Sequence, residues 1–276
     1  MLAAAGACAL AGALFSPAML APHVAAVCDA AYRIFVYAVS IVLEAGPFVL
    51  AGAVAAAWVS RIAHKGVVAA FAAAVTPGCD CSMNGFARAL RRCPPPLAGF
   101  ALTWGAACNP IALVATATVL GRHVLAARVA GALAASLAVA ALWAIIASRT
   151  TPEETRAVCH AHDGLAAHVA TAVRLLLPAA ILASVALVLL PRMIHTHATP
   201  LLSAAIGALL SPCSTADAIL AKVIGSSAPA QAAFVIASQS LDARQFFLLR
   251  RHYGTVRALL AWLSGAAGCA TAAFCA

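Results

Sequence analysis

The chain has 276 residues, of which 64% are apolar and only 9% are charged, and its mean hydropathy is +1.00. A soluble globular domain is typically about half apolar and a quarter charged, so this composition excludes an ordinary water-soluble protein and indicates a membrane protein. The formal net charge is +9, but the basic residues stand in short clusters between apolar runs. That pattern favours loops on the cytoplasmic side of a membrane over a nucleic-acid-binding surface.

The order of apolar and polar stretches predicts an all-α polytopic membrane protein made of an N-terminal helix and two repeats. Residues 1–30 form the N-terminal membrane helix, because no Lys or Arg precedes Arg33 and the charged start of a secretory leader is missing. A cleaved leader is the alternative. Residues 149–169 are a polar linker between repeats at 31–148 and 170–276. At about 20 residues per span, the repeats hold apolar segments at 31–60, 66–92, 97–120 and 123–148, then at 170–190, 200–224, 228–249 and 255–275.

Two of these apolar segments are interrupted in their middle. Residues 76–82 read Thr-Pro-Gly-Cys-Asp-Cys-Ser, and residues 211–214 read Ser-Pro-Cys-Ser, with Asp217 close behind. Superimposing the halves places Cys-Ser on Cys-Ser and Asn109 on Asp242. Interrupted segments in corresponding positions of two halves indicate the substrate site of a transporter.

The interrupted segments either cross the membrane or re-enter on the side from which they came. Loops on the cytoplasmic side carry the excess of Lys and Arg. If both segments cross, the 17 basic residues divide almost evenly between the two sides. If both re-enter, one side keeps only Arg33, Arg122, Arg128, Arg192 and Lys222. The charge bias therefore favours re-entrant hairpins and repeats of inverted topology, the architecture that builds a midplane site open alternately to either side.

The motifs resemble those of the predicted permease family that includes the organoarsenical efflux permeases. The similar stretches cover about residues 31–275 and include Glu44-Ala45-Gly46-Pro47, Pro77-Gly78-Cys79-Asp80-Cys81-Ser82, Asn109-Pro110, Pro212 to Ala218 and Leu241 to Gly254. The resemblance implies a permease, and only some family members are linked to arsenicals. Asp80 stands where the family usually has Ser, and Ser82 where it has Gly; these departures concern the substrate more than the fold.

Three thiols are candidate substrate ligands. Cys79 and Cys81 are one residue apart, which suits a soft ligand such as trivalent arsenic or a monovalent soft metal. Cys213 supplies a third sulfur if the two motifs meet, and Ser82 and Ser214 either contact substrate or cap the following helix. The alternative is that the cysteines are small residues packed at a helix break.

Carboxylates at membrane depth are candidate carriers of a coupling proton. Asp80 and Asp217 belong to the motifs, and Glu44 and Asp242 lie in other apolar segments. Such groups are rare in a bilayer unless they face a cavity, a partner or an ion path. Asp217 could instead cap a helix, and Glu44 could pair across the halves with Arg174, which could also reach the membrane surface.

Polar groups after the hairpins complete the candidate site. Asn109, which precedes Pro110, is a predicted substrate contact, and Gln239 lies in the equivalent helix of the second half. The histidines of the linker and of the loop after residue 190 favour a solvated loop over a metal site. No phosphate-binding loop is present, so ATP hydrolysis by this chain is not expected. We also expect no cofactor and no resident metal.

We therefore expect a multi-pass permease of the inner membrane rather than an enzyme. It would move a small solute or ion by alternating access, and the thiols suggest export of thiophilic metalloid or soft-metal species. Its partners would be this solute and the lipid bilayer. The alternative is a membrane redox enzyme in which Cys79 and Cys81 cycle between dithiol and disulfide, but an enzyme has no reason to repeat the Pro-Cys-Ser element.

Overall fold

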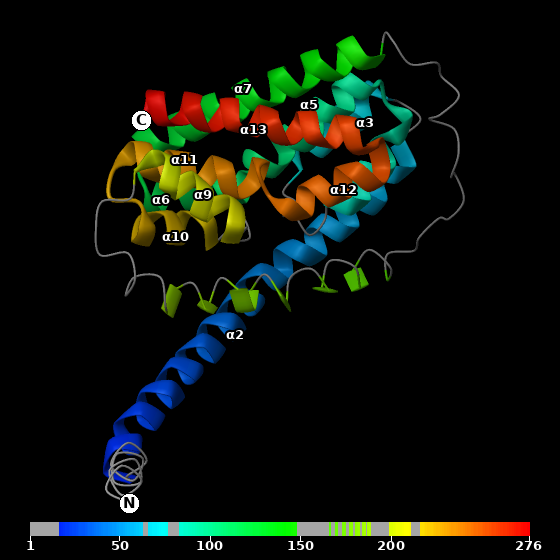
Figure 1. Ribbon diagram of the computed structural model, residues 1–276. Coiled ribbons are helices and arrows are strands. Elements are labelled where there is room, and N and C mark those ends of the chain that lie inside the picture. The colour runs from blue at the N-terminus through cyan, green and yellow to red at the C-terminus, as the bar shows by residue number, and fades with distance from the viewer. Residues whose placement is uncertain are drawn as a thin grey trace, which may run out of the picture.

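The computed structural model describes residues 17–62, 66–76, 83–147, 199–210 and 216–276, together with scattered residues between 166 and 188. Every regular element within these residues is helical (Figure 1), so the predicted all-α class is confirmed. In chain order the helices are α2 (Pro17–Ile62), α3 (Val67–Val75), α4 (Met83–Ala89), a 3₁₀ turn (Leu90–Arg92), α5 (Pro95–Ala107), α6 (Pro110–Val119), α7 (Arg122–Ala147), α9 (Pro200–Leu210), α10 (Ala216–Ile224), α11 (Ala228–Ser240), α12 (Ala243–Tyr253) and α13 (Thr255–Cys275).

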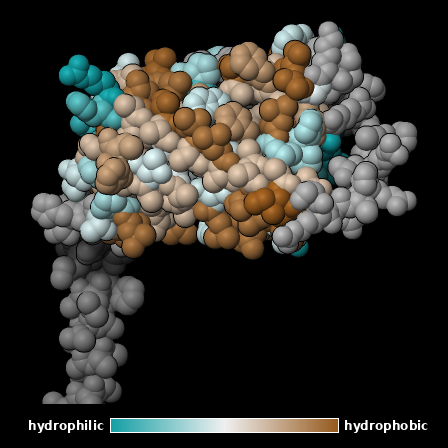
Figure 2. All heavy atoms as spheres, turned by 90° about the horizontal axis from the view of Figure 1, so that it is seen from above, coloured by the Kyte–Doolittle hydropathy of each residue, from teal (hydrophilic) through white to brown (hydrophobic). Residues whose placement is uncertain are grey.

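Within the described residues, four helical stretches are long and apolar enough to cross a bilayer. They are Ala25–Leu43, Pro95–Val119, Arg122–Ala147 and Thr255–Cys275. Large apolar side chains also cover the outside of the helix bundle, and the face seen in Figure 2 is mostly hydrophobic, with hydrophilic residues toward its ends. Soluble proteins rarely expose so much apolar surface, so these features indicate a membrane protein.

Helix α2 differs from the expected division of the N-terminal region. A boundary was predicted near residue 30, but one helix runs from Pro17 to Ile62. Its 46 residues span about 69 Å, and it extends away from the rest of the molecule (Figure 1). Its C-terminal part packs on α3 and α4, where Ala56 and Val59 are buried. A helix of this length exceeds the roughly 30 Å of hydrocarbon in a bilayer.

The most extensive contact between two helices is that of α7 and α13, which lie side by side (Figure 1). The crossing is close because it uses glycine: a Cβ on Gly131 would lie 2.6 Å from the carbonyl oxygen of Gly268. Helices in membranes associate through such small residues, since packing rather than apolar burial holds them together. Helix α5 packs on α7, and α11 packs on α13.

Several of the shorter helices contact the opposite half of the chain. Helix α6, from the first half, contacts α10 of the second half, and α12, from the second half, contacts α4 of the first. Figure 1 shows the same exchange, with α6 beside α10 and α12 on the side of α3 and α5. The two halves are therefore joined by exchanged helices as well as by the α7–α13 crossing.

Helices on either side of each motif are too short to cross a bilayer. At 1.5 Å per residue, α3 and α10, of 9 residues each, are about 14 Å long, and α9, of 11 residues, is about 16 Å long. Residues 77–82 and 211–215, which carry most of both motifs, lie outside the described residues.

Candidate functional site

The first part of the site is a break between α5 and α6, where the sequence reads Asn109-Pro110. Proline has no N–H, so the helix cannot continue its hydrogen bonds through this point. Asn109 caps α6: its Oδ1 accepts a hydrogen bond of 2.8 Å from the N–H of Ala112, and its Nδ2 donates to the carbonyl of Ala106 at 3.4 Å. The break leaves the next carbonyl, that of Ala107, to find a partner from another helix.

Arg128 on α7 supplies that partner. Its Nε donates to the carbonyl oxygen of Ala107 at 2.7 Å, and its Nη1 donates to Oγ1 of Thr116 on α6 at 2.8 Å. Arg128 has no solvent exposure, although it lies only six residues, about 9 Å, from the start of its helix. Both acceptors are neutral, so these bonds position the guanidinium without cancelling its charge.

The charge of Arg128 is balanced by Asp217 in the first turn of α10. Nη2 of Arg128 lies 2.8 Å from Oδ2 of Asp217, and neither side chain is exposed. Nε2 of Gln239 on α11 donates to the same carboxylate oxygen at 3.2 Å. The network therefore joins α5, α6 and α7 of the first half to α10 and α11 of the second.

A buried ion pair of this kind is costly to form. Removing two charges from water opposes their attraction, so such a pair adds little stability compared with apolar residues of similar size. In membrane segments, charged residues that face the interior mark substrate paths, ion paths or relays. Arg128 and Asp217 thus form the main candidate site within the described residues.

The structure brings together three of the polar groups considered from the sequence. Asp217 and Gln239 are in direct contact, and Asn109 belongs to the helix break that Arg128 completes. Asn109 acts as a helix cap here. Asp242 is fully buried at the start of α12.

Most of the remaining predicted site residues lie outside the part of the chain that the structure describes. These are Cys79, Asp80, Cys81, Ser82, Cys213 and Ser214, together with the side chain of Glu44. Arg174 is exposed in the structure. The described cysteines, namely Cys28, Cys93, Cys108, Cys269 and Cys275, are free thiols.

Arg128 is the functional candidate that the sequence analysis missed, because it was counted as a basic residue at the membrane surface. Its burial corrects that count and removes Arg128 from the side with fewer basic residues. A signal was present: Arg128 and Arg122 are the only Lys, Arg, Asp or Glu residues in the 26-residue stretch that forms α7, and Arg122 is its first residue. A lone charge inside a membrane helix is a functional candidate by default.

A second polar cluster lies where α12 meets α4 and the 3₁₀ turn. The hydroxyl of Tyr253 donates to the carbonyl of Ala87 at 2.9 Å, and Nε of Arg91 donates to the carbonyl of His252 at 3.2 Å. Burial and the charges of Arg91, Arg88 and Arg251 lower the pKa of His252 to about 4. His252 is therefore neutral at physiological pH.

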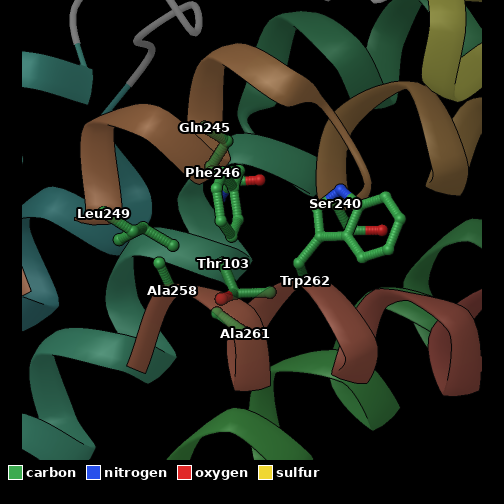
Figure 3. Close-up of a pocket in the computed structure, with 8 residues that line it drawn as sticks. All are labelled: Thr103, Ser240, Gln245, Phe246, Leu249, Ala258, Ala261 and Trp262. Carbon is green, nitrogen blue, oxygen red and sulfur yellow. The ribbon is translucent and has the colours of Figure 1, made fainter. Parts of the chain in front are cut away.

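A hollow lies between α5, the end of α11, α12 and α13 (Figure 3). Its lining combines the polar residues Thr103, Ser240 and Gln245 with apolar residues such as Leu249 and Ala261. The side chains converge so closely that no space the size of a water molecule is enclosed. The hollow does not hold a solute in this conformation.

Comparison with known proteins yields no assignment: no family model matches the chain, and neither a curated protein nor a solved structure is significantly similar.

Proposed function

We propose that the protein is a secondary transporter of the inner membrane that moves a small solute by alternating access. The observation that carries this proposal is the buried Arg128–Asp217 pair, which joins the two halves of the chain at a broken helix. A purely structural membrane bundle gains little from a buried ion pair, whereas a transporter uses such groups for substrate and proton binding. Broken helices with free carbonyls are the usual setting for these sites.

The two halves are repeats in this proposal, and the exchange of short helices supports it. The contact of α6 with α10 and the contact of α12 with α4 become equivalent when the halves are interchanged. Gly121 before α7 has φ +87, and Gly254 before α13 has φ +89. These glycines are 133 residues apart (254 − 121) and have nearly the same positive φ at the corresponding junction.

The same offset relates the ion-pair site to the hollow of Figure 3. Adding 133 to Ala107, Thr116 and Arg128 gives Ser240, Leu249 and Ala261, all of which line the hollow. The second half would thus hold an uncharged counterpart of the site, with alanine in place of arginine. Within the described residues, the Arg128–Asp217 pair therefore has no charged counterpart at the equivalent position of the second half.

The interrupted segments are re-entrant in this proposal, and a contact in the first half supports it. The thiol of Cys93 donates to the carbonyl of Gly66 at 3.1 Å. Gly66 precedes α3 and Cys93 follows the 3₁₀ turn after α4, so the two ends of the interrupted segment touch. A segment that crossed the bilayer would separate its ends by about 30 Å.

Labelling of introduced cysteines tests the hairpin. Arg61 and Pro94 are exposed and flank the segment, so we expect Arg61→Cys and Pro94→Cys to react with an impermeant maleimide from the same side of the membrane. The native cysteines are replaced in both proteins. Labelling from opposite sides would show that the segment crosses.

The cargo is proposed from Cys79 and Cys81, which favour a thiophilic metalloid or soft metal. The test is growth of a sensitive host that expresses the chain on trivalent organoarsenicals, arsenite, and monovalent copper or silver. We expect protection against one of these solutes, and loss of it in Cys79→Ser and Cys81→Ser but not in Cys275→Ser, which changes an exposed thiol. All variants must reach the membrane equally. If protection is unchanged in both Cys79→Ser and Cys81→Ser, or if there is no protection at all, the proposal of a thiophilic cargo is contradicted.

A further inference from the structure

We propose, building on the transport function above, that Arg128 and Gln239 bind a small monovalent oxyanion, such as a carboxylate, in the place that the Asp217 carboxylate occupies here. Asp217 takes up one proton from solution as the anion binds. The proposal names a class of solute for the site and makes proton and anion move together in one direction.

The geometry of the donors supports an oxyanion. Arg128 Nη2 at 2.8 Å and Gln239 Nε2 at 3.2 Å converge on one oxygen, Oδ2 of Asp217. The cationic Nη2 and the amide N–H of Gln239 face the same oxygen, and contacts of this kind to an ionised carboxylate are stronger than contacts between neutral groups. Asp217 is therefore a built-in occupant that an external anion of the same chemistry can replace.

The other bonds of Arg128 keep the site in place when Asp217 leaves. Nε and Nη1 are held by the carbonyl of Ala107 and the hydroxyl of Thr116, both on the first half of the chain. These acceptors are neutral, so the arginine keeps its full charge and its position. Only Asp217 must move, while Nη2 of Arg128 and Nε2 of Gln239 exchange its carboxylate for the anion.

Charge balance explains why a proton accompanies the anion. Arg128 and Asp217 together carry no net charge, and an added anion would leave one uncompensated negative charge in a site with no solvent exposure. A proton on Asp217 restores neutrality. Oδ1 can receive it, since both donors contact Oδ2.

Few other charges among the described residues act on this site. Helices α6, α9 and α11, which pack against α10, carry no titratable side chain. Lys222 on α10 itself is exposed, and the thiol of Cys108 lies at the helix break near Arg128. The link between anion binding and proton uptake should therefore depend on Arg128 and Asp217.

The experiment measures anion binding to the purified full-length chain in detergent. Formate and nitrate are the probes, because both stay monovalent from about pH 5 to pH 9. Dissociation constants come from the dependence of the thermal unfolding midpoint on anion concentration. We expect the wild-type dissociation constant to rise about tenfold per pH unit wherever Asp217 is ionised in the free protein, because one proton is bound with each anion.

Variants separate this mechanism from nonspecific salt effects. In Asp217→Asn, the dissociation constant should be independent of pH and, at pH 8, at least tenfold lower than in the wild type. Arg128→Met combined with Asp217→Leu gives a neutral site that should fold without responding to either anion. Lys222→Gln, which changes an exposed charge on the same helix, should behave as wild type.

Two results would overturn the inference: a wild-type response that is flat with pH, or one that persists in the neutral double variant. If the anion-binding experiment gives either of these results but the growth test shows protection, the transport proposal stands without this inference. Conversely, proton-linked anion binding without protection would support this site and remove the thiophilic cargo.

Discussion

Replacing Asp217 with leucine should destabilise the folded protein severely, because Arg128 would remain buried without a counter-charge. Coulomb attraction between charge centres about 4 Å apart is roughly 4 kcal/mol at an effective dielectric constant of 20. Removing one partner of such a pair typically costs about 3–5 kcal/mol. The 2.8 Å contact and the absence of solvent exposure on either side chain place this pair in that class.

The second step is to remove Arg128 as well, by Arg128→Met. The double variant has no buried charge, so we expect its free energy of unfolding to lie within about 2 kcal/mol of the wild type. The two changes should therefore be non-additive by at least about 2 kcal/mol in a double-mutant cycle. Unfolding is measured in mixed micelles, and Lys222→Gln serves as the control. A cost below about 1 kcal/mol for Asp217→Leu, or additive effects, would refute the reasoning.

Three further predictions concern other parts of the bundle. Gly131→Val should lower stability by about 1–3 kcal/mol, measured by thermal unfolding, because its Cβ would lie 2.6 Å from the carbonyl of Gly268; an unchanged midpoint would contradict the close helix crossing. Asn109→Ala should cost about 1 kcal/mol through loss of the α6 cap, and Asn109→Ser, whose neutral hydroxyl can accept from the same N–H, should retain more stability in the same assay. The pKa of His252 is lowered from 6.5 to about 4 in the folded state, so its contribution to stability is complete above pH 6.5 and falls as pH drops toward 4. Allowing for partial exposure, this loss is about 1–2 kcal/mol; the pH dependence of unfolding should weaken in His252→Gln but not in His123→Gln, and equal effects would contradict the assignment.

Local sequence signals predicted much of the fold. Continuous apolar runs predicted the helical class, and the Asn109-Pro110 pair was noted inside the predicted segment 97–120, which the structure divides into α5 and α6. These features depend on residues close together in the chain, since proline lacks an N–H and asparagine caps the next turn. The continuity of α2 through residue 30 was not predicted.

The candidate site was only half predictable. Asp217 and Gln239 stood out as polar residues in apolar segments, but their partner did not. Arg128 is 89 residues from Asp217 (217 − 128), and although Arg128 is the one charge inside its apolar stretch, the sequence does not show which distant groups would hold it there. Tertiary contacts decide this: the free carbonyl of Ala107 and the hydroxyl of Thr116 hold the guanidinium inside.

Access to the site from both sides of the membrane is the most direct test of the transport proposal. A single cysteine is introduced by Ser238→Cys, next to Gln239 and fully buried, in a chain whose ten native cysteines are replaced. Reaction with an impermeant thiol reagent is then measured in right-side-out and inverted vesicles, with Ala132→Cys, buried within the bundle, as the control. Alternating access predicts slow labelling of position 238 from both faces and none of position 132. Labelling of position 238 from one face only, or from neither, would contradict the account.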